Sequence, residues 1–361
     1  MKILHIVEDF SIKSGGLRTV IKNLDFYLKK LGHNSFIIAS DKEKQDDVFV
    51  VKSSNKWLYS NKWEKRISEV IDEHKIELIH IHGAWLYPQY IGAKIASQKN
   101  IPMVLSLHGM FQPWLWEKGT LKKKLYFYLL SKKHFSKAAI IHAITIQETN
   151  TIKGFFKRNN IVEIPNLITV DKVNEENNIS NKNIVYLGRL NKTKGIDILI
   201  KAFSRIQNKQ IKLVIAGGFN AYKNELETLV DFLNLKGKVE FLGEVKEEKK
   251  TKLIQTAWVM ASPTHSDVIG MVNLEAASLK TPMITTYNTG LNEKWNTNGG
   301  RLINPNVEEL AEVLTEILNW SLEERVAQGE LLYKFIKKEY SWENRLKEWE
   351  SLYKKAIVNE K

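Results

Sequence analysis

Short apolar segments of strand length alternate with longer amphipathic segments along most of the chain. In the first half, the segments with the hydrophobicity of buried strands are Ile3–Val7, Ser35–Ala39, Leu78–His82, Met103–Leu107, Ile140–Ile144 and Ile161–Ile164. In the second half they are Ile184–Leu187, Ile211–Ala216, Val239–Phe241, Ala257–Ala261 and Pro282–Thr286. Because strands separated by helices are typical of parallel sheets, the pattern predicts two doubly wound α/β domains.

The segments between the strands have the period of amphipathic helices, as in Leu17–Leu31, which Gly32 ends. After about residue 307 the pattern is continuously helical, and its last part carries Trp342, Leu346, Trp349, Leu352 and Tyr353 at helical spacing. Residues 169–183 are polar and rich in Asn, which is typical of a linker. We therefore predict an N-terminal domain over 1–168, a linker over 169–183, a second domain over 184–338 and a final helix over 339–361.

Composition agrees with two folded domains. The chain has 361 residues, of which 43% are hydrophobic and 26% charged, which excludes a disordered or fibrous protein. It contains no Cys, so disulfide scaffolds and thiolate chemistry are excluded, and a reducing, cytoplasmic location is favoured. The apolar stretch Ile3–Val7 is shorter than the roughly 7–15 residues of a signal peptide core, and no stretch reaches the roughly 20 apolar residues of a membrane span. Any membrane contact should be peripheral, on the inner face of the cell membrane.

Positive charge is concentrated in the first half. The net charge is +13, of which residues 1–165 carry +11. Such a field attracts an anionic membrane surface or a nucleic acid, and since no nucleic-acid motif accompanies it, no nucleic-acid partner is expected. Residues 121–137 mix Lys with Leu, Tyr and Phe, as an interfacial helix does. The alternatives are solubility alone, or a partly buried helix with a solvated lysine face.

In an open parallel sheet, ligands bind at the carboxyl ends of the strands. In the second half, Arg189 and Lys194 leave one strand just before a helix, which suits a diphosphate. Asp267 and Glu275 flank a helix start near Gly270, and such carboxylates can hold a sugar or ribose diol. The glycines that end the neighbouring strands, Gly217, Gly218 and Gly243, are expected to form backbone walls around a nucleotide.

The strand ends of the first half carry glycines and aromatic side chains. Gly15 and Gly16 allow the backbone to approach a ligand where a helix starts. Four aromatic residues could form a platform for a sugar ring or could pack in a core or domain interface: Trp85, Tyr87, Trp114 and Trp116. The pair His80 and His82 could ligate a metal, although a structural or cleft role is favoured. No Asp-x-Asp motif is present, so no metal and no cofactor are expected.

Taken together in their order along the chain, these motifs resemble the GT-B fold glycosyltransferases of family 4. The residues that carry the resemblance are Gly15-Gly16, His108-Gly109, Pro165-Asn166, Gly188-Arg189, Lys194-Gly195, Asp267, Glu275-Ala276, Pro282 and Ser341-Trp342-Glu343. The resemblance implies two Rossmann-like domains with a cleft between them and a final helix that crosses back to the N-terminal domain.

The resemblance also implies a role for each matching residue. Arg189 and Lys194 would hold the donor diphosphate, Glu275 the ribose hydroxyls, and His108 the transferred sugar. The amides of three residues would bind the sugar and phosphate side: Ile269, Gly270 and Met271. Asp267 would belong to the catalytic set with His108, Arg189 and Lys194, although the family usually has Glu followed by Gly or Asn where this chain has Asp267-Val268.

The activity so implied is retaining transfer of a hexose-type sugar from a UDP- or GDP-sugar, without a metal. The acceptor would be a glycan, lipid-linked if the basic half docks on a membrane, as in the assembly of surface polysaccharides including lipopolysaccharide. Two alternatives remain open at this point: a noncatalytic sugar-binding or scaffold protein of the same fold, and a nucleotide-sugar epimerase.

Overall fold

The chain forms two α/β units. The computed structural model describes residues 1–44, 46–53, 55–117, 120–170, 182–208 and 210–358. Unit 1 consists of Met1–Leu167 and Arg345–Lys361, and unit 2 of Ile168–Asn344. Most of the predicted linker, residues 171–181, lies outside the described residues.

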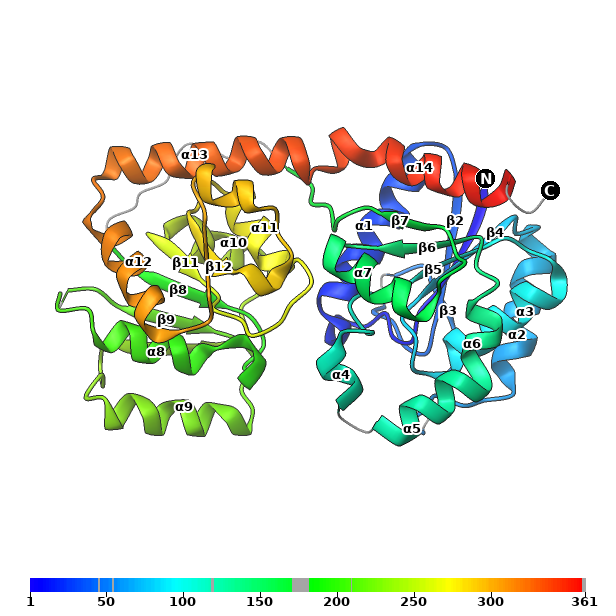
Figure 1. Ribbon diagram of the computed structural model, residues 1–361, viewed down its shortest axis with the longest axis horizontal. Helices are drawn as coiled ribbons and strands as arrows, with labels where there is room; N and C mark the ends of the chain where they lie inside the picture. Colours follow the sequence, from blue (N-terminus) through cyan, green and yellow to red (C-terminus); the bar gives the residue numbers. More distant parts are fainter. Residues whose placement is uncertain (45, 54, 118–119, 171–181, 209, 359–361) are drawn as a thin grey trace. The chain divides into compact units, whose positions relative to one another are not determined.

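Unit 1 is built on a parallel sheet of seven strands in the order β3-β2-β1-β4-β5-β6-β7 (Figure 1). The strands are β1 Lys2–Ile6, β2 Asn34–Ala39, β3 Phe49–Val50, β4 Leu78–His82, β5 Met103–Ser106, β6 Ile140–Ala143 and β7 Ile161–Glu163. Because β1 lies between β2 and β4, the chain reverses its winding direction there, and this switch point is where doubly wound sheets bind ligands.

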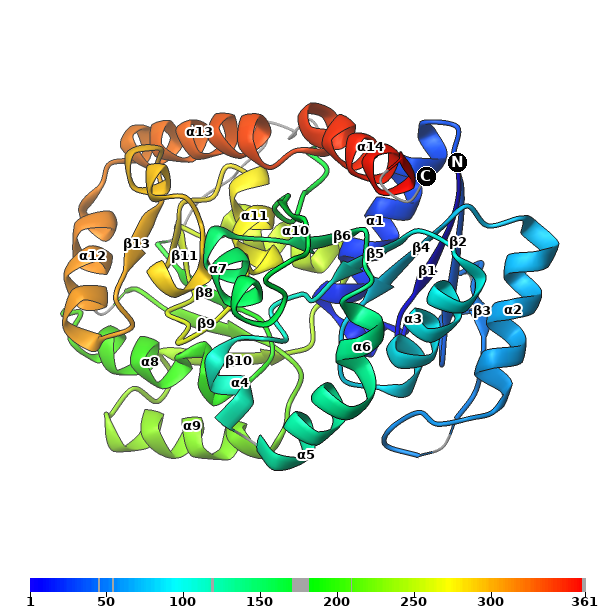
Figure 2. The same ribbon diagram turned by 45° about the vertical axis from the view of Figure 1, so that its right-hand side comes forward.

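Helices join and cover these strands. They are α1 Gly16–Lys30, α2 Lys62–His74, α3 Tyr87–Lys99, α4 Pro113–Glu117, α5 Thr120–Leu125, η2 Tyr126–Ser131, α6 Lys132–Phe135 and α7 Ile146–Phe155, with the short turn η1 at Ile12–Ser14. Figure 2 shows α2 beside α3, and these two helices are in contact. Local capping contributes to the helix ends, because the Thr145 hydroxyl accepts the amide of Glu148 at the start of α7.

The alternation of side chains along the strands gives the sheet of unit 1 two different faces. Ile79 and Ile81 of β4 join the apolar core with α2 and α3. His80 and His82, which point to the opposite face, are buried as well. That face is covered by the last helix, α14 (Trp342–Val358), whose residues from Arg345 onward belong to unit 1.

Unit 2 repeats the architecture with a six-stranded parallel sheet in the order β10-β9-β8-β11-β12-β13. Its strands are β8 Ile184–Leu187, β9 Leu213–Ala216, β10 Val239–Gly243, β11 Val259–Ala261, β12 Met283–Thr286 and β13 Arg301–Ile303. Its helices are α8 Ile196–Ser204, α9 Ala221–Phe232, α10 Glu247–Thr256, α11 Met271–Ser278, α12 Val307–Asn319 and α13 Leu322–Glu339, with short turns η3 Lys192–Lys194, η4 Tyr287–Thr289 and η5 Glu293–Thr297. The winding direction changes between β8 and β11, so the loops that follow these two strands form the second switch point.

The predicted doubly wound fold is thus confirmed, while two strands were missed. These are β3 and β13, which have two and three residues and lie at the edges of their sheets. Each pairs on one side only, β3 with β2 and β13 with β12, and each is too short to have been predicted as a strand from its sequence.

Candidate functional site

The loops after β8 and β11 are tied together at the switch point of unit 2. The amide of His265 donates to the carbonyl of Thr193 at 2.8 Å, and the hydroxyl of Thr264 donates to the same oxygen at 2.9 Å. Gly195 sits in this contact with φ +64°, and a Cβ added there would lie 2.0 Å from the carbonyl oxygen of Pro263. Glycine is therefore required at this position for two separate reasons.

This contact brings together Lys194, which the sequence analysis assigned to a diphosphate, and Asp267, which it assigned to a sugar or ribose diol. Lys194 Nζ lies 2.5 Å from Asp267 Oδ2, and both side chains are largely buried, at 19% and 25% exposure. Arg189, the other predicted diphosphate ligand, is exposed at the end of β8, where its carbonyl accepts the hydroxyl of Tyr186 at 2.9 Å. An incoming anion would therefore find Arg189 exposed but would compete with Asp267 for Lys194.

Helix α11 starts against this ion pair. Its N-cap is Gly270, at which an added Cβ would lie 2.6 Å from Asp267 Oδ2, so the carboxylate packs directly on the helix start. The first amides of a helix have no partner within it, which leaves those of Gly270 and Met271 suited to an anionic ligand.

The amide of Ile269 must be removed from the predicted ligands. It donates to the carbonyl of Thr289 at 2.9 Å, and Ile269 itself has φ +42°, a conformation that few β-branched residues adopt. This hydrogen bond anchors the loop before α11 to the segment after β12. The role of Ile269 is therefore to shape the loop, because its N–H is already occupied.

Glu275, the predicted ribose ligand, lies on α11 and has an internal partner of its own. Its Oε1 is 2.6 Å from Lys250 Nζ of α10, and its side chain is 20% exposed. The sequence analysis did not single out Lys250, because one Lys in the charged run of residues 247–252 is indistinguishable from its neighbours before the fold is known. The pair fixes the position of the carboxylate at the edge of the site.

The glycines that end β9 and β10 are close to each other. The amide of Gly217 donates to the carbonyl of Gly243 at 2.8 Å, and a Cβ on Gly217 would lie 2.0 Å from the carbonyl oxygen of Gly188. Close packing of the strand ends thus accounts for Gly217. Gly218 has open space where a Cβ would stand, and the adjacent Phe219 is 57% exposed.

In unit 1, the switch point carries the Gly-Gly turn and a partly buried acid. Gly15 precedes α1 with φ +60°, Gly16 is its first residue, and nothing lies within 4 Å of a Cβ added at Gly15. Glu8 follows β1 and accepts a hydrogen bond from the side-chain amide of Gln89. Burial raises the pKa of the Glu8 carboxyl from 4.5 to about 7.

His108 lies in a strained turn after β5, where it has φ +50° and Gly109 has φ +74°. The turn is held by Glu148, a buried carboxylate whose two oxygens accept the amides of Gly109 at 2.6 Å and Ile144 at 2.7 Å. Burial raises the pKa of Glu148, while the two amides favour its ionised form and lower it. In the sequence, Thr145-x-x-Glu148 resembles a capping box, so Glu148 could be interpreted as a local cap of α7. Its contact with the amide of Gly109 could not be predicted from this pattern.

A chain of hydrogen bonds runs through the histidine face of the sheet. Tyr353 of α14 meets His80 Nδ1 at 2.8 Å, His80 Nε2 meets Ser106 Oγ at 2.7 Å, and Ser106 Oγ meets His142 Nδ1 at 2.8 Å. The chain ends where His142 Nε2 donates to the carbonyl of Ile164 at 2.7 Å. Since a carbonyl only accepts, every proton in this chain of neutral groups has a fixed place, and the Tyr353 hydroxyl must donate to His80.

A second chain links His5 Nδ1 to His82 Nε2 at 2.9 Å and His82 Nδ1 to His108 Nε2 at 3.0 Å. Burial lowers the pKa of His5 from 6.5 to about 4 and that of His108 to about 3. The pKa values of His80 and His82 lie well below the ordinary value for the same reason, with a further contribution from neighbouring imidazoles. These rings are accordingly neutral near pH 7.

Within the described residues, His5, His80 and His82 form a group whose nitrogens lie close enough to gather around a metal ion, within 4.8 Å of one another. Both ring nitrogens of His80 and of His82 already share hydrogen bonds with protein groups. An ion would have to break these bonds, so the arrangement fits a hydrogen-bonded network better than a metal centre.

The predicted aromatic platform is largely absorbed into the core. Trp116 is 9% and Tyr87 8% exposed, and both belong to the apolar cluster of unit 1. Trp85 is half-buried and stacks on Phe111, with ring centroids 5.2 Å apart. The side chain of Trp114 lies outside the described part of the structure. Core packing, the alternative left open by the sequence, accounts for Tyr87 and Trp116.

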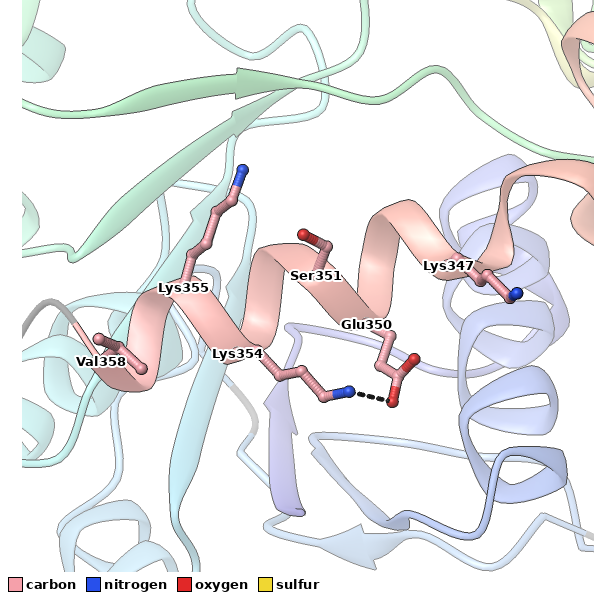
Figure 3. Close-up of a pocket in the computed structure, with 6 residues that line it drawn as sticks. All are labelled: Lys347, Glu350, Ser351, Lys354, Lys355 and Val358. Atoms are coloured by element: carbon pink, nitrogen blue, oxygen red, sulfur yellow. Dashed lines mark ion pairs between the residues drawn. The ribbon is translucent and has the colours of Figure 1, made fainter.

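A separate surface pocket of about 420 Å³ lies along α14 (Figure 3). It is lined by Lys347, Glu350, Ser351, Lys354, Lys355 and Val358, and Glu350 pairs with Lys354 at 2.7 Å. None of the predicted site residues lines this pocket.

Comparisons with known proteins agree with this architecture. Residues 14–172 match the model described as glycosyltransferase family 4, and residues 169–335 match that of the glycosyl transferases group 1. An uncharacterized glycosyltransferase of Methanocaldococcus jannaschii is 28% identical over 316 residues, covering 81% of this chain and 79% of its own. The gpi3 subunit of phosphatidylinositol N-acetylglucosaminyltransferase from Schizosaccharomyces pombe is 24% identical over 291 residues, covering 79% of this chain and 62% of its own.

Solved structures are similar over the whole length. Sucrose-phosphate synthase from Thermosynechococcus elongatus superposes with a TM-score of 0.81 at 17% identity, covering 99% of this chain and 100% of its own. Anabaena HepE in complex with UDP-glucose gives a TM-score of 0.78 at 17% identity, covering 98% and 100%. The two family models, which together span residues 14–335, show that the chain belongs to the family 4 glycosyltransferases, and the solved structures show that it has the GT-B fold. It is a glycosyltransferase, and among its described residues no helix has the length and apolar character needed to span a membrane.

Proposed function

We propose that this glycosyltransferase moves a hexose-type sugar from a UDP- or GDP-sugar to a glycan acceptor, with retention of the anomeric configuration. The observation that carries the proposal is the pair of Lys194 with Asp267 at the start of α11, together with the exposed Arg189 at the end of β8, the strand next to β11. Two cations and a helix N-terminus are suited to a diphosphate. The binding of UDP-glucose by HepE, a protein of the same fold, supports a nucleotide sugar as the donor.

The proposed reaction mainly requires that the leaving group, the nucleoside diphosphate, be stabilised. When the bond between the anomeric carbon and the phosphate oxygen breaks, its electron pair remains on the diphosphate, where Arg189 and Lys194 offset the new charge. The acceptor hydroxyl bonds to the anomeric carbon on the same face, and its proton passes to the departing diphosphate oxygen. We assign Glu275 to the ribose hydroxyls, the amides of Gly270 and Met271 to the phosphate side, and His108 to the transferred sugar.

Binding and turnover of nucleotide sugars test this function. Thermal unfolding is measured with UDP, GDP and a panel of nucleotide sugars, because a ligand that binds the native state raises the melting temperature. We expect stabilisation by one nucleotide family and its loss in Arg189→Ala. The matched control is Lys192→Ala, which removes an exposed cation of the same loop that pairs with Glu225 at 2.7 Å.

The outcomes separate the candidate functions. Transfer to an acceptor that is lost in Arg189→Ala and kept in Lys192→Ala supports the proposal, whereas equal turnover in Arg189→Ala contradicts it. Binding without transfer or hydrolysis would support the noncatalytic alternative, and interconversion of two nucleotide sugars would support the epimerase. Because the proposed reaction uses no metal, incubation with EDTA followed by desalting should leave turnover unchanged.

We further propose that the acceptor is lipid-linked and that unit 1 docks on an anionic membrane surface during surface polysaccharide assembly. Leu121 of α5 is 73% and Leu129 of η2 is 72% exposed, and Lys122, Lys124 and Lys133 are exposed in the same segment. Exposed leucines among lysines suit a surface that is apolar below a layer of negative headgroups. A relative whose name refers to phosphatidylinositol supports a lipid acceptor.

Vesicle binding tests the docking. We expect cosedimentation of the full chain with vesicles containing phosphatidylglycerol, weaker binding at high salt, and little binding to phosphatidylcholine alone. The double variant Leu121→Glu/Leu129→Glu should lose the binding. Phe232→Glu, which changes a 79% exposed side chain of α9 in unit 2, should keep it. Equal binding by both variants would overturn this assignment of the docking surface.

A further inference from the structure

The acid at the switch point of unit 1 has no cationic partner. Glu8 follows β1, and no described lysine or arginine forms an ion pair with it. The charged group that acts most on its carboxyl is Asp9, which is negative as well. Residues 1–165, by contrast, carry a net charge of +11. Because a partly buried carboxylate without a cation costs free energy, its presence in a basic domain indicates a task in ligand binding.

The two oxygens of the Glu8 carboxyl have different surroundings. Oε2 accepts a hydrogen bond from Gln89 Nε2. Oε1 has no hydrogen-bond partner in any other described residue, and it is not one of the buried atoms that lack a partner. Oε1 is therefore open to solvent, while Oε2 is held in place.

Gln89 fixes this carboxyl but does not explain why position 8 is an acid. The side chain of Gln89 is fully buried on α3, where its Oε1 accepts the amide of Leu86 at 3.2 Å and its Nε2 donates to the carbonyl of His82 at 3.0 Å. These two bonds fix the orientation of the amide, so Gln89 can only donate to Glu8. A glutamine at position 8 would accept this bond as well, so the negative charge of Glu8 needs another explanation.

The loops after three neighbouring strands meet at this carboxyl. Gly83 follows β4 with φ +91°, and a Cβ added there would lie 3.0 Å from Glu8 Oε2 and 3.1 Å from Met110 Cε. Met110 belongs to the loop after β5, which also carries His108, and β4 lies between β1 and β5 in the sheet. Glu8 is thus part of the same group of strand-end loops as His108, which we assign to the transferred sugar.

We propose that Glu8 is a specificity-determining residue of unit 1 that accepts hydrogen bonds from sugar hydroxyls of the acceptor through Oε1. An ionised carboxylate only accepts hydrogen bonds, so it suits hydroxyl groups, and it repels the charge of a phosphate or of a second carboxylate. The part of the acceptor that binds at Glu8 is therefore an uncharged sugar. That this sugar is the acceptor rests on the proposed function, whereas the preference for uncharged over phosphorylated sugars follows from Glu8 itself.

Saccharide binding tests this preference without any donor. Saturation-transfer NMR of the full chain is recorded at pH 8, where the carboxyl of Glu8 is largely ionised because its pKa is about 7. The probes are glucose, galactose, mannose and N-acetylglucosamine, each compared with its 6-phosphate. We expect at least one of these sugars to bind the wild type more tightly than its 6-phosphate. Absence of binding by all four sugars would overturn the proposal.

Two variants connect the preference to the charge of Glu8. Glu8→Gln keeps an acceptor for Gln89 but removes the charge, so its affinity for the bound sugar should fall roughly 5–10-fold, the difference between a charged and a neutral hydrogen-bond acceptor. Its affinity for the 6-phosphate should stay equal or rise. Glu8→Asp, which keeps the charge on a shorter side chain, should bind the sugar less tightly but retain the preference for it over the 6-phosphate.

A control variant excludes a general effect of removing an acid. Glu73→Gln changes a 64% exposed side chain of α2 and should bind the sugars and their 6-phosphates as the wild type does. An unchanged preference in Glu8→Gln, or an equal loss in Glu73→Gln, would refute the role of Glu8.

Nucleotide binding separates this inference from the proposed function. Glu8→Gln should bind UDP or GDP as the wild type does, because the proposed site for the diphosphate lies in unit 2. If a sugar binds through Glu8 but no nucleotide sugar is bound or turned over, the proposed function is wrong and the saccharide site remains. If transfer occurs and the KM for the acceptor is the same in Glu8→Gln, the assignment of Glu8 is wrong and the proposed function remains.

Discussion

Two ion pairs lie at the strand ends of unit 2, where we propose that the donor diphosphate binds. Lys194 pairs with Asp267 at 2.5 Å, and Lys250 pairs with Glu275 at 2.6 Å. Each pair joins a cation to a carboxylate that the family resemblance assigns to ligand binding. A diphosphate that binds Lys194 must therefore replace or share the contact with Asp267, whose negative charge opposes it.

We predict that Asp267→Asn tightens the binding of UDP or GDP while it slows transfer. Removal of the competing charge should improve the dissociation constant by up to about fivefold at low salt, the range of a partly exposed ion pair. Titration calorimetry at low and high salt measures the effect. Asp197→Asn, which breaks the pair with Lys201 on α8, should leave nucleotide affinity unchanged. Weaker nucleotide binding in Asp267→Asn would contradict this account.

The sequence predicted where the candidate residues of unit 2 lie along the chain but did not predict their contacts. Arg189, Lys194, Asp267 and Glu275 were singled out because a strand end followed by a helix start is visible in the pattern of the chain. Their internal partners could not be predicted. Lys250, for example, is 25 positions from Glu275, and nothing in the sequence of α10 distinguishes Lys250 from the neighbouring lysines. The link of His5 to His108 through His82 was equally hidden, since it depends on which strands are neighbours in the sheet.

Among the elements, the entry to α8 depends on a single glycine. We predict that Gly195→Ala destabilises unit 2 by about 2–4 kcal/mol, because it combines a positive φ with a Cβ placed 2.0 Å from Pro263 O. Gly237→Ala is the matched control, since Gly237 has φ +80° but nothing within 4 Å of an added Cβ. Urea unfolding of both variants isolates the cost of the contact, and equal losses would show that only the backbone conformation matters.

Helix α14 is joined to the sheet of unit 1 by a polar contact as well as by apolar packing. Tyr353 is fully buried and must donate to His80 Nδ1, because the carbonyl of Ile164 fixes the direction of the whole chain of hydrogen bonds. We predict that Tyr353→Phe costs about 1–3 kcal/mol of unfolding free energy, the penalty of a buried acceptor left without a donor. Tyr128→Phe, at a 53% exposed position, should cost almost nothing when measured in the same way.

Most of the strands that could be predicted lie between two neighbours, and the edge strands β7 and β10 were predicted as well. Segments such as Leu78–His82 and Ile184–Leu187 were placed with their observed bounds because a central strand of a parallel sheet needs a continuous apolar run. The edge strands β3 and β13 are only two and three residues long and were not predicted. The helical character of the last segment was visible in its period, whereas the partners of Trp349 and Tyr353 were not.

For the molecule as a whole, buried histidines make stability dependent on pH. His5, His108 and His142 have folded pKa values of about 4, 3 and 4, below the ordinary 6.5, because burial disfavours their charged forms. At pH values between these folded pKa values and 6.5, the folded state therefore binds fewer protons than the unfolded chain. Their contribution to stability is complete above pH 6.5 and is lost as the pH falls toward 4.

Glu8 acts in the opposite direction. Its folded pKa of about 7 exceeds the ordinary 4.5, so its contribution is complete below pH 4.5 and is lost as the pH rises to 7. Between pH 4.5 and 6.5 several histidines oppose Glu8 and the other carboxyl groups whose pKa values are raised, such as Glu148. We therefore predict that the urea midpoint of the wild type, followed by tryptophan fluorescence, falls as the pH is lowered from 7 to 5.

Glu8→Gln makes the two contributions separable. Glutamine keeps an oxygen that can accept the side-chain amide of Gln89 but does not titrate, so the opposing contribution of Glu8 is removed. The variant should lose stability on acidification more steeply than the wild type, and the two curves should run parallel above about pH 7. If the urea midpoints of the wild type and of Glu8→Gln both stay constant from pH 7 to 5, the buried histidines do not govern acid stability.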